Sequence, residues 1–166
     1  MRKPDESLKV NIDVKVDNKF KAGTYIVGDL CYLPWDDINS KLWDQICDEF
    51  VLNDENYAVI EGSKLFVNHT AYGDGEYEIF NGSDSYFIRV NNGETIDALP
   101  VDAGILSIID IKILEFFDIT FEDFIKDNSD SLAIVDFKDD FTCMYSNGIF
   151  YFGELVIDTE REETDY

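Results

Sequence analysis

The amino-acid sequence predicts an α+β fold: a mostly antiparallel β-sheet, sandwich-like or half-barrel, with one or two packed helices and a C-terminal β-hairpin. Three observations support this prediction. Short runs rich in β-branched and aromatic residues alternate with turn sequences such as NGSD and NNGE. Apolar residues at helical spacing are confined to two segments. Near the C-terminus, Asn147-Gly148 joins the runs FTCMYS and IFYFGELVI, and this dipeptide is the strongest short signal for a hairpin.

The N-terminal part predicts two strands and a helix. LKVNIDVKV (8–16) alternates apolar and polar residues, which is typical of a half-buried strand. TYIVGDLCYL (24–33) predicts a second strand that Gly28-Asp29 interrupts. NSKLWDQICDEF (39–50) predicts a helix, because its large apolar residues recur at spacings of three and four.

The middle of the chain predicts four short strands, YAVIEG, KLFVNH, YEIF and YFIRV. The segment HTAYGDG (69–75) lies between the second and the third of them. Its glycines and Asp74 favour a tight turn, since glycine adopts positive φ at little cost and an aspartate side chain can bond turn amides. We interpret this segment as a hairpin connection, with Tyr72 packing on the sheet.

The C-terminal part predicts one apolar strand, VDAGILSIID (101–110), and a helix that begins near Thr120. Thr120 can cap this helix, with Asp123 three residues later. The apolar residues that would share one face of it are Phe117, Phe121, Phe124 and Ile125. LAIVDF is expected to be the strand next to the C-terminal hairpin.

The length of 166 residues suits one domain. We expect a frayed N-terminus over residues 1–7, a single α+β domain over 8–157, and an acidic flexible tail over 158–166. Aromatic residues make up 14% of the chain, whereas chains that stay disordered contain few of them. The sequence is therefore expected to fold.

Acidic residues far outnumber basic ones: 36 Asp and Glu stand against 13 Lys and Arg, which gives a formal net charge of −23. Residues 1–50 carry a net charge of −3, and residues 51–166 carry −20. Such a surface repels nucleic acid and anionic membranes because it offers little to neutralise phosphates. It attracts basic surfaces. The expected partner is a basic protein, with no direct nucleic-acid binding and no membrane association.

Cysteine usage and hydropathy bear on the compartment. The three cysteines, Cys31, Cys47 and Cys143, are widely spaced and form no CxxC pair, so neither a zinc site nor a disulfide framework is indicated. The N-terminus lacks the apolar core of a signal peptide, and no apolar run approaches about 18 residues. We expect a cytoplasmic protein without a cofactor.

Chemically capable side chains accompany the glycine-rich turns. His69 is the single histidine, but neither HExxH nor GxSxG occurs. Asp29, Asp74 and Asp102 each lie near a glycine at a strand edge or turn, and they could bind a divalent cation if the fold brings them together. Turn formation and solvation explain the same residues without a ligand, and no catalytic or metal-binding residue is assigned. The candidate ligand site comprises Asp29, Cys31, Tyr32, His69, Tyr72, Asp74 and Asp102.

Acidic residues are dense between residues 97 and 140, where 12 acids and 3 lysines give a net charge of −9. Two alternatives remain open: a solubilising surface, or a surface that imitates the phosphate array of DNA and docks on a basic patch. The candidate acidic interaction surface comprises Asp110, Glu115, Asp118, Glu122, Asp123, Asp127, Asp130, Asp136, Asp139 and Asp140.

Three segments, AGTYIVGDLCYL (22–33), AYGDGEYEI (71–79) and PVDAGILSIID (100–110), follow one another in an order that resembles small uncharacterised phage and bacterial proteins. Those proteins share a G-D-P-C-Y opening, a G-D-G-x-Y middle and a V-D-[S/A]-G close. This chain departs from the pattern at Leu30, where the pattern has proline. The resemblance implies a small β-rich domain and a phage or bacterial setting, and it implies no catalytic role.

Two functions from different classes follow. The first is a non-catalytic acidic interaction protein, encoded by a phage or mobile element, that binds and inhibits a basic bacterial protein. Such a protein would act against host defence, for example as a DNA mimic at a nucleic-acid-binding site. The alternative is a domain that binds or hydrolyses a small ligand, a nucleotide or a divalent-metal complex through the glycine-flanked aspartates. An enzyme is the less favoured of the two.

Overall fold

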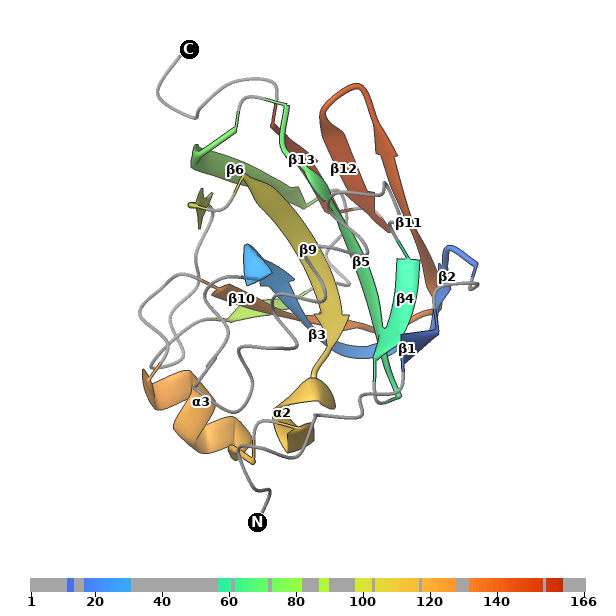
Figure 1. Ribbon diagram of the computed structural model, residues 1–166, viewed down its shortest axis with the longest axis vertical. Coiled ribbons are helices and arrows are strands. Elements are labelled where there is room, and N and C mark those ends of the chain that lie inside the picture. Colours follow the sequence, from blue (N-terminus) through green and yellow to red (C-terminus); the bar gives the residue numbers. More distant parts are fainter. Residues whose placement is uncertain are drawn as a thin grey trace.

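The computed structural model describes the chain in a series of segments. These are residues 12–13, 17–30, 57–60, 62–71, 73–81, 87–89, 98–102, 104–116, 118–127, 132–153 and 155–159. Their strands form two sheets, and the two short helices lie together at one end of the molecule (Figure 1). Every strand pair within these segments is antiparallel. The predicted sandwich-like α+β fold is therefore confirmed.

The first sheet has seven strands, and neighbours in it are mostly far apart in the sequence. Across the sheet they are β1 (Ile12–Asp13), β4 (Tyr57–Ile60), β5 (Ser63–His69), β9 (Ile105–Asp110), β3 (Gly23–Gly28), β10 (Leu132–Phe137) and β7 (Phe87–Arg89). Only β4 and β5 are consecutive in the chain. The sheet therefore assembles from segments that span more than a hundred residues.

The second sheet has six strands and is built around the C-terminal part of the chain. Across the sheet they are β2 (Lys19–Phe20), β11 (Phe141–Ser146), β12 (Ile149–Phe152), β13 (Leu155–Asp158), β6 (Gly75–Asn81) and β8 (Ala98–Val101). The predicted hairpin at Asn147-Gly148 is confirmed as the β11–β12 connection. Both turn residues have positive φ, 52° and 85°, as a two-residue type I′ turn requires.

The main hydrophobic core lies between the two sheets and is rich in aromatic side chains. It includes Phe20, Tyr25, Phe66, Tyr77, Phe137, Phe141, Phe150 and Phe152. In the six-stranded sheet the inward residues alternate with solvent-facing ones, as in β11, where Phe141 and Cys143 are buried and Thr142 and Met144 are exposed. This alternation is typical of an antiparallel sheet with one wet face.

A second core covers the opposite face of the seven-stranded sheet. Side chains of α2 (Ile113–Phe116) and α3 (Phe121–Asp127) pack there, among them Ile113 and Phe124. Neighbouring residues of one strand therefore face different cores: Ile108 faces the sandwich and Ile109 faces the helices. Burial on both faces explains why ILSIID and LAIVDF are continuous apolar runs rather than alternating ones.

The start of α3 agrees with the prediction. The backbone amide of Asp123 donates a hydrogen bond of 3.1 Å to Oγ1 of Thr120, which satisfies one of the free amides of the first turn. Phe124 is buried, whereas Phe121 is 38% exposed. Phe117 and the side chain of Ile125 lie outside the described residues, so the shared apolar face stays a prediction.

Two expectations about strands are wrong. VDAGILSIID is not one strand: it divides at Asp102–Gly104 into the end of β8 and the whole of β9, which lie in different sheets. LAIVDF (β10) does not pair with the hairpin but with β3 and β7. The turn at 138–140 carries the chain from one sheet to the other, and the rings of Phe137 and Phe141 stack across it with centroids 3.8 Å apart.

The folded part extends beyond the boundary that the sequence predicts. Asp158 belongs to β13, and Thr159 is fully buried, with its amide donating to the carbonyl of Gly148 at 2.8 Å. The helix expected at 39–50, most of the strand at 8–16, and the segments 1–7 and 160–166 lie outside the described residues. Within the described part, no helix is long and apolar enough to cross a membrane.

Candidate functional site

Four of the candidate ligand residues are described, Asp29, His69, Asp74 and Asp102, and they lie at the end of the sandwich where β3, β5 and β8 stop. Asp29 directly follows β3 and is fully buried. Its Oδ2 accepts a hydrogen bond of 2.9 Å from the backbone amide of Asp102, the residue after β8. The buried side chain of Asp29, which follows a strand of the seven-stranded sheet, thus bonds the residue that follows β8 in the six-stranded sheet.

The segment HTAYGDG is not a hairpin connection, because β5 and β6 belong to different sheets. It is a crossover that Thr70 organises. Oγ1 of Thr70 donates to the carbonyl of Gly73 at 2.6 Å and accepts from the amide of Gly73 at 3.1 Å. The amide of Thr70 donates to the carbonyl of Gly104 at 3.0 Å, which ties the crossover to the start of β9. Turn-forming residues mark where a chain reverses, but they do not specify which strand receives it.

The three aspartate-bearing segments therefore converge. A Cβ atom placed on Gly104 would lie 3.7 Å from Oδ1 of Asp74, and the hydrogen bonds above join Thr70 to Gly104 and Asp29 to Asp102. We call these segments, at residues 29, 70–74 and 102–104, the aspartate junction. His69 borders it as the exposed last residue of β5, opposite Ile105. Cys31, Tyr32 and Tyr72 lie outside the described residues.

The described carboxylates of the aspartate junction differ in their surroundings. Among the residues that the structure describes, no group of three or more His, Cys, Asp or Glu side chains is placed to hold a metal ion. Asp29 is buried and bonded to a backbone amide, whereas Asp74 and Asp102 are exposed. The convergence of these segments is accounted for by the joining of the two sheets.

The candidate acidic surface residues occupy several places. The segment from α2 to α3, residues 113–127, is called the helical segment. It carries four exposed acids, which we call the helical acids: Glu115, Asp118, Glu122 and Asp123. Asp139 and Asp140 are exposed in the turn between β10 and β11, and Asp136, in β10, accepts a hydrogen bond from Oγ1 of Thr24 at 2.6 Å. Asp110 ends β9. The side chain of Asp127 and the whole of Asp130 lie outside what the structure describes.

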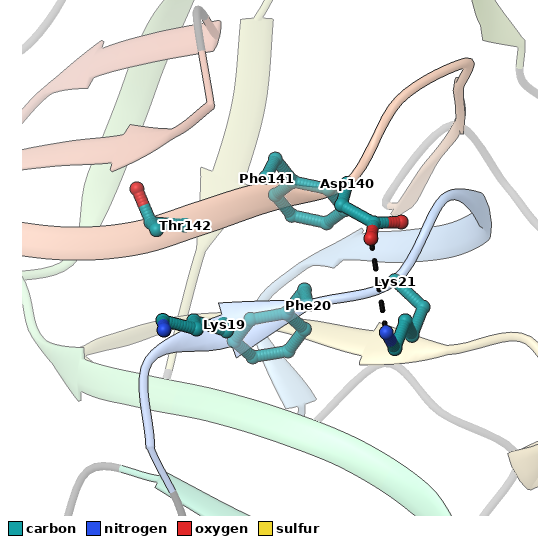
Figure 2. Close-up of a pocket in the computed structure, with 6 residues that line it drawn as sticks. All are labelled: Lys19, Phe20, Lys21, Asp140, Phe141 and Thr142. Carbon is teal, nitrogen blue, oxygen red and sulfur yellow. Dashed lines mark ion pairs between the residues drawn. The ribbon is translucent and has the colours of Figure 1, made fainter.

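Basic residues gather around β2, the starts of β3 and β5, and the end of β9. A pocket of about 620 Å³ opens there, and we call it the lysine pocket. Its lining residues are Asp17, Lys19, Lys21, Ala22, Gly23, Thr24, Tyr25, Gly62, Lys64, Asp110, Ile111 and Lys112. A smaller adjoining pocket of about 280 Å³ shares Lys19 and Lys21 with it (Figure 2).

Lys64 is the most firmly held of these lysines. Its side chain is 20% exposed, and Nζ donates to Oδ1 of Asp17 at 2.7 Å and also to the carbonyl of Lys19. The same ammonium lies 4.8 Å from the centre of the Phe20 ring, a favourable cation–π distance. Lys21 is different: it is well exposed and pairs with Asp140 at 3.8 Å, as Figure 2 shows.

Among the residues that the structure describes, four groups have shifted pKa values. The hydrogen bond from Lys64 lowers the pKa of Asp17. Burial raises the pKa of the Tyr25 and Tyr57 hydroxyls and of the Cys143 thiol. The two hydroxyls donate to backbone carbonyls, of Lys21 at 2.8 Å and of Cys143 at 2.7 Å. These three raised values belong to core packing, because the groups hold their protons against a dry interior.

The sequence did not predict the lysine pocket or the hydrogen bonds by which Thr70 and Thr159 join distant segments. The scarcity of lysine gave a usable signal, since Lys19 and Lys21 flank a single phenylalanine in a chain of only 13 basic residues. Nothing local pointed to Lys64 or Lys112, which reach the pocket from other strands. Thr159 accepts from the amide of Ala71 at 3.1 Å, another tie that joins distant segments.

No protein-family model matches this chain, and searches among curated proteins and solved structures likewise find no match.

Proposed function

We propose that this protein is a non-catalytic interaction protein that binds a basic partner through its acidic surface. The proposed partner is a nucleic-acid-binding protein of a bacterium, and the proposed consequence is competition for its nucleic-acid site. The observation that supports this function most is the segregation of charge. Exposed acids lie along the helical segment, whereas four of the five described lysine side chains line one pocket.

The helical acids are available to a partner. Glu115, Asp118, Glu122 and Asp123 are all exposed, and among the described side chains none of them forms an ion pair. The two ion pairs of the described part both involve lysines of the lysine pocket. Uncompensated negative charge of this kind speeds encounter with a basic surface and favours one orientation of approach.

The net negative charge of the chain is large enough to affect the stability of the fold. A net charge of −23 on 166 residues opposes compaction, because like charges repel. The two hydrophobic cores offset that repulsion with apolar burial. A basic partner that covers the helical acids would relieve the repulsion, so complex formation is expected to stabilise the fold.

The test is capture of partners from a bacterial lysate with the full chain, followed by affinity measurement with the purified partner at low and at high salt. The variant Glu115→Gln/Asp118→Asn/Glu122→Gln neutralises three of the four helical acids and leaves Asp123 unchanged. We expect it to weaken binding about ten-fold or more, and we expect raised salt to weaken the binding of the unsubstituted chain.

The matched control is Glu76→Gln/Glu78→Gln/Asp158→Asn, which removes the same charge from the outward positions of β6 and β13, opposite the buried side chains of those strands. Its effect on affinity should be several-fold smaller. Equal losses in both variants would show that only the net charge matters. Affinity that does not change with salt would rule out the acidic surface.

A further inference from the structure

We propose that the lysine pocket is a binding site for a small organic phosphate. This inference is independent of the proposed partner binding, because the pocket lies at the β2–β3 turn and the ends of β5 and β9, and none of the helical acids lines it.

Charge distinguishes the lysine pocket from the rest of the protein. Of the five lysine side chains that the structure describes, four line it: Lys19, Lys21, Lys64 and Lys112. Asp17 and Asp110 are the only acids among its described lining residues, so this described lining carries a positive surplus of two. In a chain with almost three acids for each base, such a local surplus is a specific feature that favours an anion.

Two of the ammonium groups remain available. Lys21 is paired with Asp140 and Lys64 with Asp17. Lys19 and Lys112 form no ion pair within the described residues. Lys64 is already fixed over the Phe20 ring by its two hydrogen bonds, so it would lose little conformational freedom on binding.

The backbone of the lysine pocket is open to close approach. Gly23 and Gly62 both line it, and a Cβ atom on either would meet no other atom within 4 Å. Gly62 has φ of 81°, a conformation that side chains disfavour. Bare backbone beside lysine ammoniums is a combination that phosphate groups use, since lysine acts as a point charge toward phosphate.

The size and neutral lining point to more than an inorganic ion. A volume of about 620 Å³ lies within the range of small-molecule sites. Thr24 and Ile111 supply polar and apolar surface for an uncharged portion of the ligand. The surplus of two positive charges matches a phosphomonoester, which carries about −1.5 to −2 at neutral pH.

The experiment is calorimetric titration of the full chain, at constant ionic strength, with inorganic phosphate, glucose 6-phosphate, adenosine monophosphate and an Asp/Glu-rich peptide. We expect at least one organic phosphate to bind with a Kd in the millimolar range or tighter, and to bind more tightly than inorganic phosphate. Amide NMR shifts on titration should be largest at Gly23 and Gly62, which needs no variant.

Lys19→Gln and Lys112→Gln should each weaken the binding of the organic phosphate about five-fold or more. Lys138→Gln removes the same charge from an exposed position that does not line the pocket, and it should change affinity less than two-fold. Equal losses in all three variants, shifts located elsewhere, or no binding by any phosphate probe would overturn the proposal. Binding of the acidic peptide alone would also overturn it, and would identify a protein segment as the occupant.

Discussion

The carboxylate of Asp29 accepts a hydrogen bond of 2.9 Å from the backbone amide of Asp102, and these two residues follow strands of different sheets. Asp29 is completely buried, so water cannot replace the bond if it is lost. A single side chain therefore helps to fix the relative position of the two layers at the aspartate junction.

Replacing Asp29 with Ala should lower the free energy of unfolding by about 2–3 kcal/mol, because the Asp102 amide would lose a charged acceptor inside the protein. Asp29→Asn retains an oxygen that can accept the same bond, so its loss should be smaller. Urea denaturation measures both. Equal stability of Asp29→Ala and the unsubstituted chain would show that the bond does not support the fold.

Ser63 offers an opposite prediction. Its Oγ is buried and has no hydrogen-bond partner in the part of the chain that the structure describes. Ser63→Ala should raise the free energy of unfolding by about 1 kcal/mol, because the folded state no longer buries an unsatisfied hydroxyl.

Ser107 is the matched control for Ser63, since its buried Oγ donates to the carbonyl of Gly28 at 2.7 Å. Ser107→Ala should lower the free energy of unfolding by about 1 kcal/mol. Thermal and urea unfolding of the two variants should therefore move in opposite directions. A loss of stability in Ser63→Ala would show that its hydroxyl has a partner after all.

The stability of the protein should be sensitive to substitution of Gly148 in the β11–β12 turn and insensitive to substitution of Asn147 by glycine. Gly148 has φ of 85°, so Gly148→Ala should cost about 1–2 kcal/mol of stability. Asn147 has φ of 52°, which glycine adopts freely, so Asn147→Gly should change the free energy of unfolding by no more than about 0.5 kcal/mol. Equal effects in denaturant melts would contradict the type I′ assignment.

Stability should fall at alkaline pH. Burial raises the pKa of Cys143, Tyr25 and Tyr57, so these groups keep their protons in the folded protein while the unfolded chain loses them above pH of about 8.5–10. Stability is therefore complete below that window and declines as pH rises through it, with a limiting slope of about 1.4 kcal/mol per pH unit for each group. Urea denaturation from pH 7 upward measures the slope, and Tyr25→Phe should reduce it. A flat profile would contradict the assigned burial.

The sequence predicted the elements of the fold better than their partners. The β11–β12 hairpin and the Thr120 cap were predicted correctly, because each depends on residues within a few positions of one another. The sequence did not predict the pairing of β10 with β3 or the change of sheet after Asp102. Both depend on which distant strand offers a complementary apolar face. Burial of the seven-stranded sheet on both sides also removed the alternation that would have marked its register.

The candidate sites show the same limit. The resemblance drew attention to Asp29, Asp74 and Asp102, and the structure brings their segments together, but with Asp29 engaged in a backbone hydrogen bond. The lysine pocket was invisible because Lys64 and Lys112 are isolated in the sequence. Sites assembled from single residues on separate strands leave no local motif.

The distribution of the last four strands has a consequence for synthesis on the ribosome. β10 is an inner strand of one sheet, and β11, β12 and β13 make up half of the other. The seven-stranded sheet cannot be completed until residue 137 has left the exit tunnel, and the six-stranded sheet not until residue 158 has left it, so the apolar runs of β3, β5 and β9 remain uncovered during most of translation. Nascent chains of this protein should therefore depend on chaperones that hold them until the final strands arrive, while their negative charge keeps neighbouring copies apart.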